Sequence, residues 1–337
     1  MMSEPGRLEW AEVEEPDLRG AGEALVSPIA VATCDLDGPI VTGETPIPGP
    51  IALGHECVGE VLAVGSEVDA FKPGDLVVVP FQISCGQCAR CHAGLTGNCL
   101  SVPERSMFGF GALGGEWGGM LSDLIRVPYA EAMLVGAPPQ LDPVSIASAS
   151  DNIPDAWRTV APHLAATPGA EVLVLGGGAR SISLYATGIA LALGARGVTY
   201  LDSDPGRLAI ASDLGADVIE GPAPYRLERD FPIVMDGGAS RDSLACACRS
   251  TEPGGHCIHV GILYEPETPI PLLEMYSTGV NLHVGRAAAR ADIPAALELI
   301  AGGGFDPSVV TDRVLPFVAA ETALLEPHTK LVFSRDA

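Results

Sequence analysis

The sequence predicts an α/β protein of two domains, one rich in β-strands and the other built around a doubly wound parallel sheet. Short strand-like segments, broken by Pro and Gly, fill most of the first 150 residues. From residue 171 to residue 262, strand and helix patterns alternate, which is the order that lays parallel strands between layers of helices. The length of 337 residues is sufficient for two domains.

Composition and charge exclude several kinds of partner. The chain is 47% hydrophobic and 18% charged, with 40 glycines and 29 prolines, as in loop-rich globular proteins. It carries 19 Lys and Arg against 43 Asp and Glu, a formal net charge of -24, so its surface repels phosphate backbones and anionic lipids. We therefore expect neither a nucleic acid nor a membrane as a partner.

The sequence also predicts a cytoplasmic protein. Residues 1–16 are acidic and lack the apolar core of a secretory signal. The most apolar later segment, 182–195, is too short and too interrupted by Thr and Gly to span a bilayer. The nine cysteines of such a chain favour metal binding or catalysis over disulfides.

His55 stands at the head of an expected strand. The segment 54–68, GHECVGEVLAVGSEV, alternates apolar and polar residues after this histidine. A metal ligand is best held on such a stiff element, and Glu56 beside it is suited to support it. A histidine in this position is also often only structural, so its assignment depends on the rest of the chain.

Cys34 follows an apolar strand-like segment and precedes two acidic residues, Asp35 and Asp37. An isolated cysteine is by default a buried thiol, but one at a strand-to-loop corner is also suited to bind a metal as thiolate. About twenty residues separate Cys34 from His55, enough for the loop to fold back.

Four cysteines form the most specific local motif of the chain: Cys85, Cys88, Cys91 and Cys99. Their spacing lets four thiolates reach one tetrahedral Zn²⁺, and four protein ligands leave no open position. We therefore predict a structural zinc, which stabilises a lobe (about 85–99) with little apolar content of its own. A disulfide cluster is the alternative, and the cytosolic context disfavours it.

A dinucleotide-binding arrangement begins at residue 171. An apolar strand leads into Gly176-Gly-Gly178, then into a helix-period segment, and the next strand ends at Asp202. We expect Gly176 to permit the tight turn and Gly178 to let the backbone approach the pyrophosphate at the helix N-terminus. Ser181 stands where the third glycine of this fingerprint is usual.

Asp202 predicts the choice of cofactor. A carboxylate at this place accepts hydrogen bonds from the ribose hydroxyls of NAD and repels the 2′-phosphate of NADP. Arg207, at the start of the next expected helix, is placed to cover the adenosine. The sequence therefore favours NAD.

Together these motifs resemble those of the zinc-containing alcohol dehydrogenases of the medium-chain dehydrogenase/reductase superfamily, over nearly the whole chain. The resemblance is carried by Gly54-His55-Glu56 with Gly59 and Gly65, the four-cysteine lobe, and the segment from Gly176 to Asp202. It implies a GroES-like catalytic domain at 1–150, a Rossmann NAD-binding domain at 151–284, a return to the catalytic domain at 285–337, and an active site between them.

The resemblance further implies that Cys34, His55 and Asp151 bind a catalytic zinc. Asp151 lies where related enzymes place a cysteine or an aspartate, although by itself it is equally compatible with a helix N-cap. Asp37 matches the aspartate that orients the zinc-bound histidine, and Glu56 matches a supporting glutamate. A thiolate, an imidazole and a carboxylate leave the fourth position open, as in catalytic sites.

The implied function is hydride transfer between an alcohol or polyol and NAD(H), or the reverse carbonyl reduction, with two zinc ions per chain. Zinc lowers the pKa of an alcohol that it binds, and the protein aligns the reacting carbon with the nicotinamide. We also expect a homodimer or homotetramer. Two alternatives stay open: a diverged enzyme that uses zinc and retained NAD for a non-redox or dismutase-like reaction, and a catalytically silent nucleotide-binding protein.

Three residues depart from the family pattern. Leu36 stands two residues after Cys34, where a Thr or Ser hydroxyl ordinarily passes on the alcohol proton. Asp155 replaces a threonine near the nicotinamide, and Asp35 replaces a glycine or basic residue near the pyrophosphate. Each is equally compatible with neutral variation, but the missing hydroxyl makes Asp155 and Asp35 the candidates for proton transfer.

Overall fold

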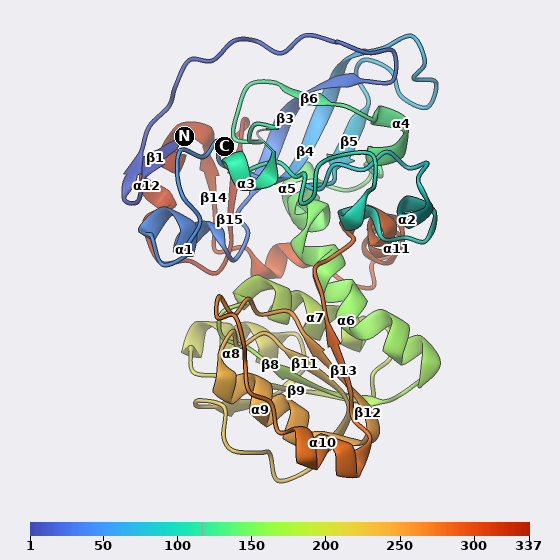
Figure 1. Cartoon of the computed structure of the whole chain (residues 1–337), viewed down its shortest axis with the longest axis vertical. Helices are drawn as coiled ribbons and strands as arrows, with labels where there is room; N and C mark the ends of the chain where they lie inside the picture. The colour runs from blue at the N-terminus through green and yellow to red at the C-terminus, as the bar shows by residue number, and fades with distance from the viewer. Residues whose placement is uncertain (116) are drawn as a thin grey trace. The chain divides into compact units, whose positions relative to one another are not determined.

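A computed structural model describes residues 1–115 and 117–337, and Figure 1 labels its helices and strands. Contacts between residues divide the chain into two compact units. The first unit comprises Met1–Pro154, Ala287–Ala301 and Thr311–Ala337, and the second comprises Asp155–Arg286 and Gly302–Val310.

Within the described residues, the first unit contains a seven-stranded sheet with the order β14-β15-β3-β4-β5-β7, and β6 pairs with β3. All its pairs are antiparallel except β14 with β15. The strands are β3 (Ala24–Ala32), β4 (Glu56–Val64), β5 (Leu76–Val79), β6 (Ile125–Val127), β7 (Val135–Gly136), β14 (Arg313–Pro316) and β15 (Leu331–Ser334). A small separate sheet pairs β1 (Met2–Glu4) with β2 (Arg7–Leu8).

Strands β3 and β4 form a closely packed antiparallel pair in the first unit. Alternate residues of β3 are buried, as expected for a strand with one face on the core. The register shifts next to Pro28, which faces Gly59 and has no N–H to donate to the ladder. A Cβ atom on Gly59 would lie 2.6 Å from Val26, so the strands approach too closely for any larger residue.

The helices of the first unit are short, apart from one that comes from the C-terminal part of the chain. They are α1 (Asp37–Thr42), α2 (Ala89–His92), η1 (Thr96–Asn98), α3 (Gly111–Gly114), α4 (Ala130–Met133), α5 (Pro143–Ile146), η2 (Ala147–Ser150), α11 (Ala289–Ala301), η4 (Phe317–Ala319) and α12 (Ala320–Ala323). The tail also supplies β15, which pairs with β3 in the middle of the sheet. The C-terminal segment is thereby part of the first unit's core.

The second unit is built around a parallel sheet with the order β10-β9-β8-β11-β12-β13. Its strands are β8 (Glu171–Leu175), β9 (Gly197–Asp202), β10 (Asp217–Glu220), β11 (Phe231–Asp236), β12 (Thr251–His259) and β13 (Asn281–Val284). The strand order reverses between β8 and β11, which is the switch point where doubly wound sheets bind dinucleotides. The predicted α/β class, with a β-rich part and a parallel sheet, is confirmed.

Helices connect the parallel strands, as in Figure 1. The connecting helices are α7 (Arg180–Ala192), α8 (Pro205–Asp213), α9 (Arg241–Arg249) and α10 (Leu272–Thr278). The second unit also contains η3 (Pro307–Val310), and α6 (Asn152–Ala166) starts in the first unit and continues in the second. Four consecutive residues of β8, from Val172 to Leu175, are fully buried, which is typical of a strand covered on both faces. Among the described residues, no helix is both long and apolar enough to cross a membrane.

Candidate functional site

The end of β3 and the start of β4 bring Cys34 and His55 together. Ala32 faces Glu56 in the antiparallel ladder, so the residues that follow β3 lie beside the residue that precedes β4. Both side chains are buried, with 6% of Cys34 and none of His55 exposed. The sequence separation of the two residues is therefore closed by strand pairing alone.

Asp151 joins this pair through the short helix η2. The Ser150 hydroxyl donates to the carbonyl of Cys57 (2.9 Å) and accepts from its N–H (2.8 Å), which ties the end of η2 to β4. The next residue, Asp151, is 7% exposed, and its Oδ2 lies 3.5 Å from Nε2 of His55. The structure thus brings together the three residues that we predicted as zinc ligands.

The other nitrogen of His55 faces Asp37. Its Nδ1 lies 3.7 Å from Oδ1 of Asp37, whose Oδ2 accepts a hydrogen bond from the N–H of Cys34 (2.8 Å). Neither ring nitrogen of His55 has a hydrogen-bond partner among the described residues, although both are buried. Phe81 and Phe110 flank the ring, with centroids 5.7 and 4.8 Å away. The imidazole is therefore in contact with two aromatic rings, with a carboxylate toward each nitrogen.

The cluster fits a zinc ion. Ligand atoms of Cys34, His55, Glu56 and Asp151 all lie within 4.8 Å of one another. Ligands of a tetrahedral zinc lie about 3.3–3.8 Å apart, given bond lengths of about 2.0–2.3 Å, and the 3.5 Å from His55 to Asp151 matches. A buried imidazole nitrogen without a hydrogen bond is costly unless something binds it, and a cation at this place would do so.

Acidic groups dominate the electrostatics of the cluster. Burial raises the pKa of the Cys34 thiol well above its usual range, and nearby carboxylates, Asp151 first among them, raise it further. Burial opposes a charged His55, but Asp37 and Asp151 outweigh this effect and raise the pKa of His55 to about 9. A site with this surplus of negative charge is suited to hold a divalent cation.

Glu56 belongs to this cluster and is paired with Lys330, a residue that the sequence analysis missed. Neither side chain is exposed, and Nζ of Lys330 donates to Oε2 (3.1 Å) and Oε1 (3.3 Å) of Glu56 and to the carbonyl of Thr33. Burial raises the pKa of Glu56 to about 8, although Lys330 opposes this shift. No local sequence signal marks Lys330, because it precedes β15 at the opposite end of the chain.

The four-cysteine lobe also has the geometry of a zinc site. Its four sulfur atoms lie within 4.8 Å of one another, with Cys88 Sγ 3.5 Å from Cys91 and 4.0 Å from Cys99, and all four thiols are free of disulfides. Backbone N–H groups of residues 87, 100, 101 and 85 donate to sulfur at 3.4 Å. Such donors, that of Leu100 first, lower the pKa of Cys88 to about 6. Hydrogen bonds of this kind stabilise thiolates, which are the form that binds zinc.

The glycine turn between β8 and α7 is closely packed. A Cβ atom on Gly176 would lie 2.2 Å from Oδ2 of Asp202, and one on Gly178 would lie 2.5 Å from Ala239. The left-handed backbone, however, is at Gly177 (φ 125°), which the sequence analysis did not single out. Ser181 is fully buried in the first turn of α7, whose N-cap residue makes no side-chain hydrogen bond.

Asp202 ends β9 and is held by several neighbours. Arg207 donates to both carboxylate oxygens at 2.7 Å, and Tyr200 Oη and the Asp204 N–H each donate at 2.9 Å. Burial opposes ionisation, but these donors outweigh it and lower the pKa of Asp202. The carboxylate is therefore charged and lies directly across Gly176 at the carboxyl end of the sheet. Arg207, which we expected over the adenosine, is its ion-pair partner.

Asp155 and Leu36 are engaged in other contacts. Oδ1 of Asp155 lies 2.5 Å from Nε of Arg158, one turn along α6, in the second unit. Leu36 packs against an apolar cluster of the first unit. Asp35 is buried, with 8% of its surface exposed. An Asp155 carboxylate that is already paired with a guanidinium is a less available proton acceptor than the sequence alone indicates.

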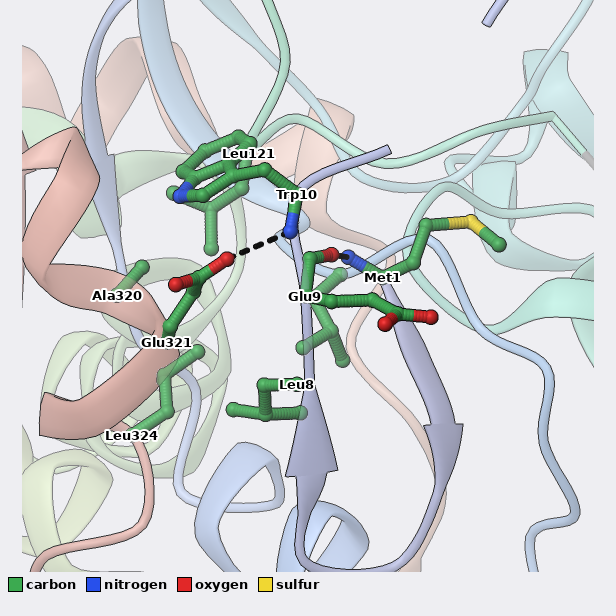
Figure 2. A pocket seen from close by; sticks show the side chains of 9 residues that line it. Met1, Leu8, Glu9, Trp10, Leu121, Ala320, Glu321 and Leu324 are labelled. Carbon is green, nitrogen blue, oxygen red and sulfur yellow. Dashed lines mark hydrogen bonds between the residues drawn. The ribbon is translucent and has the colours of Figure 1, made fainter. Parts of the chain in front are cut away.

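A mostly apolar pocket lies elsewhere in the first unit (Figure 2). Figure 2 shows Trp10 and Leu121 at one side and Leu8 with Leu324 at the other. The backbone N–H of Trp10 donates to Oε1 of Glu321 (2.7 Å), which connects the N-terminal segment to α12. None of the predicted zinc ligands lines this pocket.

Comparison with known proteins agrees with this geometry. The alcohol dehydrogenase GroES-like domain family model matches residues 20–138. A probable zinc-binding alcohol dehydrogenase of Mycobacterium tuberculosis is 30% identical over 307 residues, covering 90% of this chain and 78% of the relative. A glutathione-independent formaldehyde dehydrogenase of Bacillus subtilis is 32% identical over 241 residues, 69% of this chain but only 57% of the relative. The solved alcohol dehydrogenase TADH from Thermus sp. ATN1 superimposes with a TM-score of 0.87 at 29% identity, covering 98% of each chain.

Proposed function

Because the chain belongs to the zinc-containing alcohol dehydrogenases of the medium-chain dehydrogenase/reductase superfamily, we propose that it is an NAD-dependent oxidoreductase that interconverts an alcohol or polyol and its carbonyl. The observation that carries this proposal is the buried cluster of Cys34, His55 and Asp151, in which His55 and Asp151 are 3.5 Å apart. The dismutase-like and non-redox alternatives are not favoured, since the relative that covers 90% of this chain at 30% identity is a probable zinc-binding alcohol dehydrogenase.

In this proposal Cys34, His55 and Asp151 hold the catalytic zinc, and a fourth position stays open for substrate. The ion would act as a Lewis acid, which would polarise the substrate oxygen and favour loss of the alcohol proton. Asp37 orients His55 through Nδ1, and Glu56 with Lys330 supports the cluster. The rings of Phe81 and Phe110 pack near His55, whose side chain is fully buried.

The remaining predicted residues take structural and cofactor roles. Cys85, Cys88, Cys91 and Cys99 hold a second, structural zinc that fixes their lobe. In the second unit, Gly176, Gly178 and Ser181 form the turn for the pyrophosphate, and Asp202 with Arg207 receives the adenosine ribose of NAD. We accordingly assign catalysis to domains at 1–150 and 285–337 and cofactor binding to 151–284.

The alcohol proton needs a route that does not use residue 36. Leu36 has no hydroxyl, and we propose Asp155 as the group that takes its place. Since Arg158 holds Asp155 at 2.5 Å, proton transfer through this carboxylate requires a change in that pair. We further propose a cytoplasmic location, because the zinc-binding cysteines need a reducing compartment. We also propose that the protein is a homodimer or homotetramer.

A substrate panel tests the proposed activity. Primary alcohols, secondary alcohols, polyols and aldehydes are each offered with NAD⁺ or NADH, and the reaction is followed at the NADH absorbance. We expect turnover with at least one class, and its loss in His55→Ala. Tightly retained NAD without turnover of added NAD⁺ would instead support a dismutase-like enzyme, and no turnover in a protein that holds both zinc ions would contradict the proposal.

A further inference from the structure

Three histidines of the second unit lie together, whereas both predicted zinc sites belong to the first unit. His163 lies on α6, His256 on β12 and His283 on the edge strand β13, three elements that Figure 1 labels. One ring nitrogen from each lies within 4.8 Å of the others. The ring centroids are 4.6 to 5.2 Å apart. Of the seven histidines in the chain, these three therefore form one cluster.

Strand register explains how two of these rings meet. In the parallel pair β12 and β13, His256 faces Asn281 and His283 faces Ile258. Residues two apart on a strand share a face, so His256 and His283 are diagonal neighbours on one face of the sheet. Their Nδ1 and Nε2 atoms lie 2.9 Å apart in a hydrogen bond, and α6 places His163 over both.

The cluster is separate from the predicted cofactor site. His256 lies level with Ile233 of β11 and hence with Val172 of β8, near the start of these strands. The glycine turn follows β8 at its other end, where doubly wound sheets bind nucleotides. The dehydrogenase function proposed above assigns no role to these histidines.

We propose that His163, His256 and His283 form a third metal site, which takes a divalent ion that prefers nitrogen ligands, such as Zn²⁺. Three neutral imidazoles and one or more waters suit such an ion. On binding, the hydrogen bond between His256 and His283 is replaced by two bonds to the metal. The ring that donates in this hydrogen bond moves its proton through solvent to its other nitrogen, so all three rings bind as neutral imidazoles and no proton is gained or lost.

The surroundings are compatible with a bound cation. Burial, then His256 and His283, lowers the pKa of His163 to about 4, so this ring is neutral at pH 7, as a ligand must be. Arg158 is the nearby positive group, since its charge acts on His283, but it is paired with Asp155 at 2.5 Å. His283 is exposed, which gives an ion access from solvent. The site would link α6 to the sheet edge.

Metal counting tests this proposal. The purified full-length chain is loaded with Zn²⁺, dialysed, and analysed for zinc per chain, and Zn²⁺ is then titrated by calorimetry. We expect three equivalents in the wild type and two in His283→Gln and in His163→Gln. His328→Gln is the matched control, because His328 is a half-buried histidine of the first unit that bonds the carbonyl of Glu326, and it should keep three.

A second readout separates loss of the ion from misfolding. Zn²⁺ in excess should raise the Tm of the wild type and of His328→Gln by about 5 °C, and leave that of His283→Gln unchanged. Equal zinc counts and equal Tm responses in wild type and both cluster variants would overturn the proposal. This test is independent of the proposed dehydrogenase function. If the catalytic zinc site were wrong, the zinc count would not fall in His55→Ala, whatever the histidine cluster binds.

Discussion

Replacing Lys330 with methionine should reveal how strongly the predicted zinc cluster depends on the C-terminal segment. Lys330 is completely buried and donates to both oxygens of Glu56 and to the carbonyl of Thr33. Methionine has a similar length and no charge, so Lys330→Met removes these donors without opening a large cavity. What remains is a buried Glu56 side chain without its counter-charge, which either stays ionised and unpaired or takes up a proton.

The expected loss of unfolding free energy is about 3 kcal/mol at pH 7. Removing one partner of a buried ion pair typically costs about 3–5 kcal/mol, because the other charge stays buried and unpaired. The lower end applies here, since Glu56 can take up a proton: burial already raises its pKa to about 8 in the presence of Lys330. The loss of the donor to the carbonyl of Thr33 contributes to the same total.

This protonation gives the prediction a pH dependence. In Lys330→Met the folded-state pKa of Glu56 rises further above its unfolded value, so the folded protein binds more protons than the unfolded chain. Stability of the variant, relative to wild type, should therefore fall as the pH rises from 7 to 9. Adding Glu56→Gln removes the titrating group, and the double variant should recover most of the loss and have no such pH dependence.

Urea unfolding of the wild type, Lys330→Met, the double variant Lys330→Met with Glu56→Gln, and Lys72→Met measures these differences in unfolding free energy. Lys72→Met is the matched control: Lys72 is the other lysine of the chain, its side chain is 80% exposed, and its pair with Asp75 is worth little. It should change the unfolding free energy by less than about 1 kcal/mol. If Lys330→Met is as mild as Lys72→Met, or if Glu56→Gln fails to restore stability, the buried pair does not support the cluster as we reason.

Five other variants test the remaining assignments. His55→Ala should abolish activity and lower the zinc content, counted outside the histidine cluster, from two ions to one. Cys88→Ser should instead lower Tm or solubility. One zinc ion in the wild type and none in Cys88→Ser would contradict the catalytic zinc assignment. Asp202→Ser should narrow the preference for NAD over NADP, and equal affinity of wild type for both would show that Asp202 does not select the cofactor. Asp155→Asn should lower turnover about tenfold or more and shift the pH–rate profile, and Leu36→Thr should raise activity with simple alcohols; an unchanged profile in Asp155→Asn leaves solvent as the proton acceptor.

Features with a short sequence span were accessible from the sequence. The four cysteines lie within one lobe, and β8, the glycine turn and β9 follow one another along the chain, so spacing and periodicity predict both. The positive φ at Gly177 was not accessible in the same way. Three consecutive glycines are equivalent in sequence, and only their contacts with Asp202 and Ala239 distinguish them.

Features that depend on long-range pairing were less accessible. Lys330 lies 274 residues from Glu56, and the two meet only because β15 pairs with β3, which pairs with β4. The histidine cluster has the same origin, since its members come from α6 and two strands of one sheet. A lone His or Lys has no local pattern that reveals its partners, so the topology has to be known first.

The charges around His55 connect these observations into one argument about metal binding. Burial and the carboxylates of Asp151, Glu56 and Asp37 hold the Cys34 thiol in its neutral form, and Lys330 is paired with Glu56. A divalent cation held by Cys34, His55 and Asp151 would reverse this balance, because its charge would offset these carboxylates and stabilise the thiolate form of Cys34. Binding of the ion and ionisation of Cys34 are thus one linked step, which explains why so many acids are buried around a single cysteine.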